Sequence, residues 1–381
     1  MKSAVFVTIS TIHSLIDGFI DLLEFSLRGC IAYPDNNVKI CLARHVYIYA
    51  ICIDLAIERL NELQFSDHRE SAAGLGLGTR NSIPDLRTAH VKHTEWAQHL
   101  VSLTQNRPEF LDEPTQRLFK RISLELSAVS DELTNLSEAD NYRCELGGSR
   151  RAPGRQPNFE FRAGSKVRDE PTEGRQKLVR IYHALLMATE IPTIEACADL
   201  ILTFGEMPWQ FVTDMARQIW DESRHASIMQ ARLLELGGHL GLYPIDIDLW
   251  NVCANRSLAL RIAIHQCYGE WIGVDAAIFV SESLRTAGFE QDAQIWEFVA
   301  RDEILHVKMG NRWLNFLTSD EIDRVRILKE AEEIRRKNGF GGNLFPFHEW
   351  ACHAADFSDS EVESFLAKSR GDASIPELWR F

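Results

Sequence analysis

Two Glu-x-x-His motifs constrain the fold of this chain more than any other feature of its sequence. They pair Glu222 with His225 and Glu303 with His306, and each pair directly follows an aspartate. Residues three apart on an α-helix project from one face, so each pair can bind a common centre. Of the thirteen histidines, only these two have a glutamate three residues upstream. The repetition argues against chance placement.

A further glutamate precedes each motif at nearly the same distance. Glu190 lies 32 residues before Glu222, and Glu270 lies 33 residues before Glu303. A turn at residues 205–208 leaves two helical arms of about 20 Å in the first half, since a helix rises about 1.5 Å per residue. A hairpin there brings Glu190 and Glu222 side by side. Four helices thus offer the ligand set of di-iron and di-manganese bundles.

The charge of these side chains also favours a metal site. Four carboxylates that face one bundle interior would repel each other and be poorly solvated. Two divalent cations would cancel this charge while both imidazoles stay neutral. The sequence therefore predicts a di-metal site whose ligands and catalytic residues are Glu190, Glu222, His225, Glu270, Glu303 and His306.

The apolar periodicity predicts an all-α protein built around a four-helix bundle. The bundle occupies residues 176–317, and a long crossover joins its second and third helices. Its helices are expected at about 176–204, 209–236, 254–286 and 291–317, with turns near Gly205, Gly237-Gly238 and Gly288.

The rest of the chain divides by composition. Residues 1–145 are expected to form an N-terminal helical domain. The pattern of its first ten residues is compatible with either a helix or a strand. Residues 146–175 are rich in Gly, Pro and Arg and predict a linker, or an arm laid over a neighbouring surface. Residues 318–381 predict a C-terminal helix and a tail that pack on the bundle.

Pro192 stands two residues after Glu190, inside the first helix of the bundle. Proline removes a helix hydrogen bond and crowds the carbonyl of Ala188, so this helix must be kinked, widened or restarted there. Glu195 then becomes a rival ligand to Glu190, or an extra one, although its distance from Glu222 suits the hairpin less well. His183 and Cys267 are further candidates for an extra ligand or for the wall of a pocket.

Composition excludes several other classes of protein. The net charge of −14 disfavours a nucleic-acid partner. None of the eight cysteines forms a C-x-x-C pair, which excludes a rubredoxin-type iron module and favours reduced thiols in the cytoplasm. The longest apolar stretch, residues 46–57, is broken by Asp54 and is too short to span a bilayer. No signal peptide is evident, so we expect a cytoplasmic protein without a membrane partner.

The two motifs belong to a wider set of residues between Leu178 and Leu366. The set comprises His183, Glu190 and Glu195, Asp221-Glu222-x-x-His225, Glu270 with Gly273-Val274-Asp275, Asp302-Glu303-x-x-His306-Val307, Gly310-x-Arg312-Trp313 and Pro346-Phe347. On these residues the stretch resembles the ferritin-like superfamily, and more narrowly a bacterial branch of it, of ferritin-like oxygenase type, that brings no established substrate. The resemblance implies that Asp221 and Asp302 accept hydrogen bonds from the free ring nitrogens of the ligand histidines, each on the partner helix.

The expected activity is that of a non-haem di-iron oxygenase. Such an enzyme uses O2 to hydroxylate, N-oxygenate or desaturate a small organic substrate, with secondary metabolism as one setting. It needs two iron ions, with manganese as the alternative metal, and electrons from an external reductase or ferredoxin. A homodimer is left open. The alternatives are a rubrerythrin-like peroxidase, a tRNA hydroxylase and a non-catalytic iron- or manganese-binding protein.

Overall fold

The computed structural model describes residues 4–64, 74, 76–78, 86–105, 112–138, 152–162, 173–339, 345–368 and 375. Regular structure in these ranges is helical, and the only β-type pairing within them is an isolated bridge between Phe161 and Ile245. The prediction of an all-α protein is confirmed. The four-helix bundle stays a prediction.

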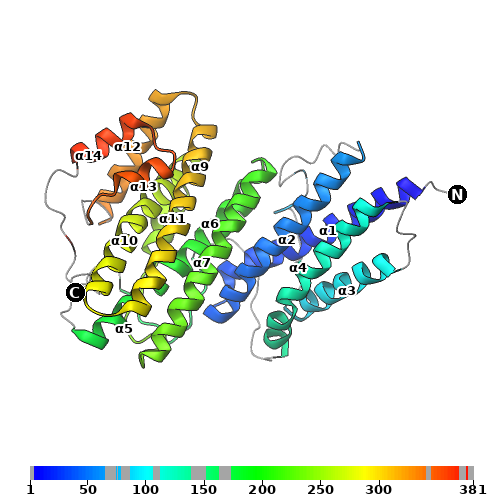
Figure 1. Cartoon of the computed structure of the whole chain (residues 1–381), viewed down its shortest axis with the longest axis horizontal. Coiled ribbons are helices and arrows are strands. Elements are labelled where there is room, and N and C mark those ends of the chain that lie inside the picture. The colour runs from blue at the N-terminus through cyan, green and yellow to red at the C-terminus, as the bar shows by residue number, and fades with distance from the viewer. Residues whose placement is uncertain are drawn as a thin grey trace. The chain divides into compact units, whose positions relative to one another are not determined.

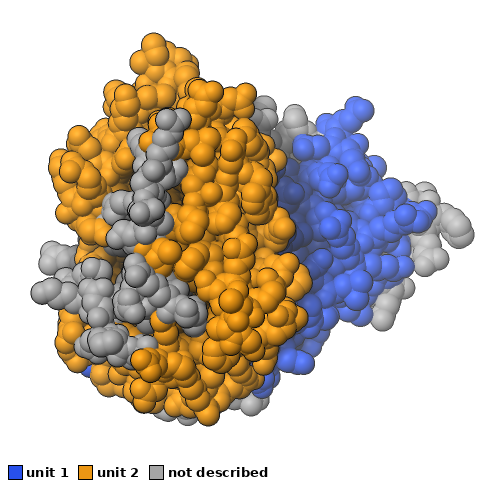
Figure 2. Space-filling model, turned by 60° about the vertical axis from the view of Figure 1, so that its left-hand side comes forward, with its two compact units in different colours: residues 1–157, 193–224 blue, residues 158–192, 225–381 orange. Residues whose placement is uncertain are grey.

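The chain divides into two compact units (Figure 2). The first comprises residues 1–157 and 193–224, and the second comprises residues 158–192 and 225–381. This division follows packing rather than composition, and it cuts helix α7 (Trp209–Glu235) between Arg224 and His225. The domain boundaries expected from composition stay predictions.

Four helices of the first unit pack against one another in a closed ring of contacts (Figure 1). They are α1 (Ala4–Ala32), α2 (Asn36–Glu62), α3 (Leu86–Gln105) and α4 (Glu113–Glu138), and α1 packs on α2, α2 on α4, α4 on α3, and α3 on α1. Asp35 caps α2 by accepting from the backbone N–H of Asn37 at 2.8 Å. The apolar start of the chain is helical from Ala4 onward, which settles the choice between helix and strand.

Two of these helices are apolar enough to resemble membrane spans. By length and composition, α1 and α2 could each cross a bilayer. Core helices of globular proteins meet the same criterion, and 67% of the apolar window of α2 is buried inside the protein, against 39% for α1. We therefore treat the apolar character of α2 as that of a core helix.

The second unit contains most of the remaining elements. Its α10 packs along α11, while η3 packs against both α11 and α12. The elements that lie wholly within the second unit are α5 (Gly174–Leu185), η2 (Leu186–Glu190), α8 (Asp248–Cys253), α9 (Leu258–Ile262), η3 (Ala263–Gly269), α10 (Glu270–Thr286), α11 (Glu290–Leu317), α12 (Glu321–Lys337), α13 (Glu349–Ala354) and α14 (Asp359–Lys368). Helix α6 (Ile191–Thr203) directly follows η2, and its residues from Thr193 onward belong to the first unit.

Two helices end at the predicted glycines. The backbone φ is +79° at Gly237, after α7, and +85° at Gly288, after α10. Glycine adopts this left-handed conformation without a Cβ penalty. The N–H of Gly238 donates to the carbonyl of Leu233 at 2.9 Å, and the N–H of Phe289 donates to that of Leu284 at 2.8 Å. Both bonds close the helix ends where the sequence predicted turns.

The described part of the Gly/Pro/Arg-rich segment lies on folded surfaces. In the first unit, Gly154 donates its N–H to the carbonyl of Ile31 at 2.8 Å, and an added Cβ at Gly154 would lie 2.1 Å from the carbonyl oxygen of Ala32. In the second unit, Arg162 N–H donates to the Ile245 carbonyl at 2.9 Å. These contacts favour the arm over the free linker for residues 152–162.

The tail after α12 packs on α10. Phe345 lies against Phe279 and Phe347 against Trp271, with ring centroids 5.9 Å and 5.5 Å apart. His348 Nδ1 lies 2.8 Å from Asp275 Oδ1, which also accepts the His348 backbone N–H. The aromatic pairs and the hydrogen bonds of His348 to Asp275 together fix this segment to α10, the helix that begins at Glu270.

Candidate metal centre

Six buried side chains of the kinds that bind metal form two overlapping groups. One group is Glu190, Glu222, His225 and Glu303, and the other is Glu222, Glu270, Glu303 and His306. Within each group, one ligand atom from every residue lies within 4.8 Å of the others. Glu222 and Glu303 are common to both groups. Each group adds one glutamate and one histidine of its own.

Helix α7 brings Glu222 to this centre. It carries both Glu222 and His225. Because the helix is continuous, Glu222 and His225 lie on one face, one turn apart. The structure thus gathers the six residues that the sequence predicted as ligands.

The distances suit metal ligation. Ligands about 2.1 Å from one ion are about 3.0–3.4 Å apart at angles of 90–110°. His306 Nδ1 lies 3.0 Å from Glu303 Oε2, and His225 Nδ1 lies 3.4 Å from Glu190 Oε2, both within this range. His225 Nδ1 also lies 3.7 Å from Glu303 Oε1, slightly beyond it. Both imidazoles therefore direct Nδ1 toward the carboxylates. The donor set of imidazole and carboxylate suits iron, manganese and zinc.

Asp302 orients one of the histidines. Its Oδ2 lies 3.1 Å from His225 Nε2, so the ring can donate its N–H there and keep Nδ1 for a metal. This is the contact that the resemblance implies for Asp302. Asp221 lies in the first unit, where Arg217 donates to its Oδ2 at 2.8 Å and Arg224 to its Oδ1 at 2.9 Å. Its expected role beside a histidine stays a prediction.

The helix is widened where Pro192 requires it. The five residues Leu186–Glu190 form a single π-helical segment, η2, and the N–H of Ile191 donates to the carbonyl of Leu186, five residues back. Glu190 is the last residue of η2. A second π-helical segment, η3, ends at Gly269, directly before Glu270. Glu190 and Glu270 each belong to a single ligand group, and each thus lies at the end of a π-helical turn. Such turns are frequent at functional sites.

Glu195 is bound elsewhere. Its Oε1 accepts from Lys39 Nζ at 2.6 Å, and its Oε2 accepts from Arg155 Nη2 at 2.8 Å. Lys39 also donates to the carbonyls of Cys30 and Ile31 at 2.9 Å and 3.0 Å. The side chains of Glu195 and Lys39 are fully buried. Both oxygens of Glu195 thus already accept from cations, and the structure brings Glu190 to the ligand groups in its place.

Two other candidates from the sequence are not in either group. His183 packs edge-on against Tyr243 with ring centroids 5.4 Å apart, and burial lowers its pKa to about 4, so the ring is neutral at pH 7. Cys267 is fully buried, and burial raises the pKa of its thiol to about 12. A thiol in this state is a core side chain rather than a reactive one.

His265 contacts a predicted ligand but was missed in the sequence analysis. Its Nε2 lies 2.8 Å from Glu270 Oε1. The two residues are five apart, and five residues on an α-helix turn the face by about 140°. Only the π-helical register of η3 brings them together. Pro192 indicates the widened turn at η2, but no proline lies in η3 or directly after it.

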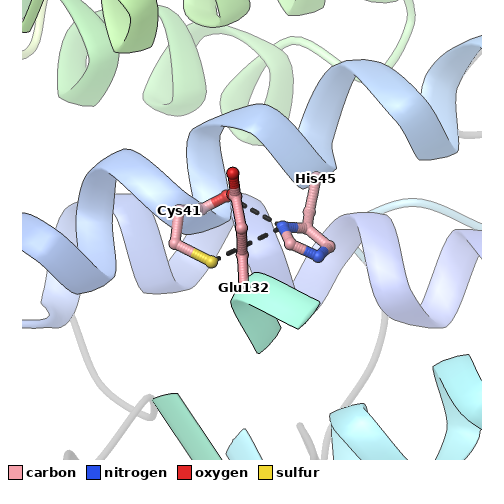
Figure 3. Close-up of side chains that lie close together, drawn as sticks. All are labelled: Cys41, His45 and Glu132. Atoms are coloured by element: carbon pink, nitrogen blue, oxygen red, sulfur yellow. Dashed lines mark hydrogen bonds between the residues drawn. The ribbon is translucent and has the colours of Figure 1, made fainter. Parts of the chain in front are cut away.

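A third group of metal-ligating types lies in the first unit (Figure 3). It comprises Cys41, His45 and Glu132. His45 Nδ1 donates to the Cys41 carbonyl at 2.8 Å, so that oxygen occupies the place of an ion on Nδ1. Arg44 pairs with Glu132, and burial raises the pKa of the Cys41 thiol. These contacts indicate a polar core cluster rather than a metal site.

We expect Gly310→Ala to destabilise the protein by about 1–3 kcal/mol through overpacking. A Cβ at Gly310, on α11, would lie 2.6 Å from Gln266 Cβ and 3.0 Å from the Gln266 carbonyl carbon. Gly273→Ala is the control, because its Cβ meets nothing closer than Glu303 Cδ at 3.8 Å. Both variants gain helix propensity, so urea unfolding midpoints isolate the clash. Equal midpoints would show that η3 does not need the close approach.

The fold and the centre define an all-helical protein with buried Glu/His groups that could hold metal ions. The chain belongs to the family described as "Protein of unknown function (DUF455)", whose model matches residues 113–363. An uncharacterised protein of Haemophilus influenzae is 29% identical over 123 residues, which cover 32% of this chain and 43% of that protein. No solved structure matches the chain. The family match spans the six residues of the two ligand groups.

Proposed function

We propose that this protein is a ferritin-like, carboxylate-bridged di-iron oxygenase that acts on a small organic substrate. The observation that carries the proposal is the sharing of Glu222 and Glu303 by two ligand groups. Two ions that share a pair of carboxylates, each with its own Glu and His, constitute the ligand pattern of carboxylate-bridged di-metal bundles. The DUF455 match adds no activity of its own.

The side chains have separate roles in this proposal. Glu222 and Glu303 would each contribute to both ions, while Glu190 with His225 and Glu270 with His306 would each complete the ligands of one ion. Asp302 holds the His225 ring so that Nδ1 faces the centre. Bound ferrous ions would supply the electrons and the open positions that the reduction of O2 requires.

The surroundings of the centre suit this chemistry. The six residues are at most 6% exposed when backbone and side chain are counted together, so bulk water has little access to the ligands. The seven cysteines in the described part of the chain form no disulfide with one another, which fits a reducing cytoplasm. Since no C-x-x-C pair occurs in the sequence, the electrons come from an external reductase or ferredoxin.

The first test is anaerobic loading with Fe(II), followed by exposure to O2, for the native chain and for Glu270→Ala. We expect about two irons per native chain and rapid O2 consumption that depends on them. Glu270→Ala should lose the ion held by Glu270 and His306, and O2 consumption with it. Iron content is measured by chelator absorbance and O2 with an electrode. A native chain without iron, or a variant that loads equally well, would contradict the proposal.

The same preparation separates the alternatives. Iron that reacts faster with H2O2 than with O2 would favour a rubrerythrin-like peroxidase. Bound metal that consumes neither oxidant would favour a non-catalytic binding protein. Tight tRNA binding at moderate salt would favour a tRNA hydroxylase, which the net charge of −14 disfavours.

A further inference from the structure

His265 is tied to Glu270 through both backbone and side chain. The N–H of Glu270 donates to the carbonyl of His265, five residues back, and His265 Nε2 lies 2.8 Å from Glu270 Oε1. Both side chains are buried, with exposed fractions of 5% and 8%. The π-helical register therefore fixes the imidazole over the carboxylate.

The neighbours of His265 set which ring nitrogen donates. Gln266 Nε2 lies 3.2 Å from His265 Nδ1, so the amide can donate to Nδ1 and leave the ring proton on Nε2, which faces Glu270. Gly269 leaves room for the ring, since a Cβ there would lie 3.3 Å from His265 Cδ2. From α12, Arg335 donates to the carbonyl of Ile264 at 2.9 Å and braces η3.

The corresponding glutamate of the other group is held differently. Thr189 Oγ1 lies 3.1 Å from Glu190 Oε1 but only 2.6 Å from the carbonyl oxygen of Leu185. A hydroxyl has one proton, and the shorter contact favours the carbonyl. Thr189 is thus a weak donor to Glu190, whereas His265 presents an imidazole N–H to Glu270 at close range. The two halves of the centre are inequivalent.

We infer that His265 is a positioning residue that fixes the Glu270 carboxylate for one of two metal ions and makes the two ions bind with different affinity. The inference rests on the proposed di-metal centre and deepens it. Partners that orient a metal ligand contribute about 10–100-fold in metal affinity. The ion held by Glu270 and His306 should depend on His265, and the ion held by Glu190 and His225 should not.

The test is an anaerobic titration of the metal-free, full-length chain with Co(II), followed by calorimetry and visible absorption. We expect His265→Leu to weaken one of the two binding steps by about 10–100-fold and to leave the other unchanged. His265→Gln keeps an N–H donor and should recover part of the loss. Thr189→Val, beside Glu190, should change either step by much less. Circular dichroism reports whether each variant is folded.

The outcomes separate this inference from the proposed function. Two native binding steps with an unchanged His265→Leu titration would overturn the inference alone. An equal loss of Co(II) affinity at both binding steps, in His265→Leu and His265→Gln alike, would also overturn the inference. A donor to Glu270 alone should affect only the ion that Glu270 holds. A native chain that binds no Co(II) would overturn the proposed centre, and the inference with it.

Discussion

Glu303→Gln is expected to reduce bound metal from about two ions per chain to well below one. Glu303 belongs to both ligand groups, so its loss removes a ligand from each ion. Glu190→Gln and Glu270→Gln should each retain about one ion, because each of these residues belongs to a single group. The measurement is metal analysis after anaerobic loading with Fe(II) or Mn(II) and removal of free metal.

The stability of the metal-free protein is the internal control for Glu303→Gln. Removing one of several close, buried carboxylates relieves repulsion, so the metal-free variant should unfold no earlier than the metal-free native chain. Metal should raise the unfolding temperature of the native chain, through mass action, and not that of the variant. Glu297→Gln changes an exposed glutamate of the same helix, which pairs with Arg285, and should load as the native chain does. Full loading of Glu303→Gln would contradict the shared-ligand assignment.

Glu195→Leu is expected to lower the free energy of unfolding by about 3–5 kcal/mol, because it leaves the buried charges of Lys39 and Arg155 without their carboxylate. Lys39 is fully buried and Arg155 is 3% exposed. Burial already lowers the pKa of Lys39, and the charge of Glu195 opposes that shift. Urea unfolding measures the loss. Metal loading of the folded variant should stay at the native level.

An exposed ion pair of the same unit provides the control for Glu195→Leu. Glu113 lies 2.8 Å from Arg117, and both side chains are more than half exposed. Glu113→Ala should therefore change stability by less than about 1 kcal/mol. If folded Glu195→Leu lost metal while keeping its stability, Glu195 would be a ligand and the structural role assigned here would be wrong.

The features set by local spacing could be predicted from the sequence. The two Glu-x-x-His pairs and the glutamates upstream follow helical geometry, and the structure gathers them in the two ligand groups. Pro192 predicted a kinked, widened or restarted helix, and the structure has the widened form at η2. The glycine ends of α7 and α10 were also predictable, because only glycine takes their φ values at no cost.

Two kinds of feature could not be predicted from the sequence: contacts between residues far apart in the chain, and a π-helical turn that no residue in the sequence signals. The partners of Glu195 lie 156 and 40 residues away, and one of them belongs to a segment that composition describes only as linker or arm. Nothing in the letters of residues 263–269 signals a widened turn, so His265 and Glu270 look unrelated at a spacing of five. Both misses concern contacts that only the folded chain defines.

The two π-helical segments separate a helix into parts with independent registers. Each segment shifts the face of everything before it relative to everything after it, and each ends at or directly before a glutamate of the centre. His265, ahead of Glu270, therefore meets that ligand at a spacing of five residues, which an uninterrupted α-helix would place on different faces.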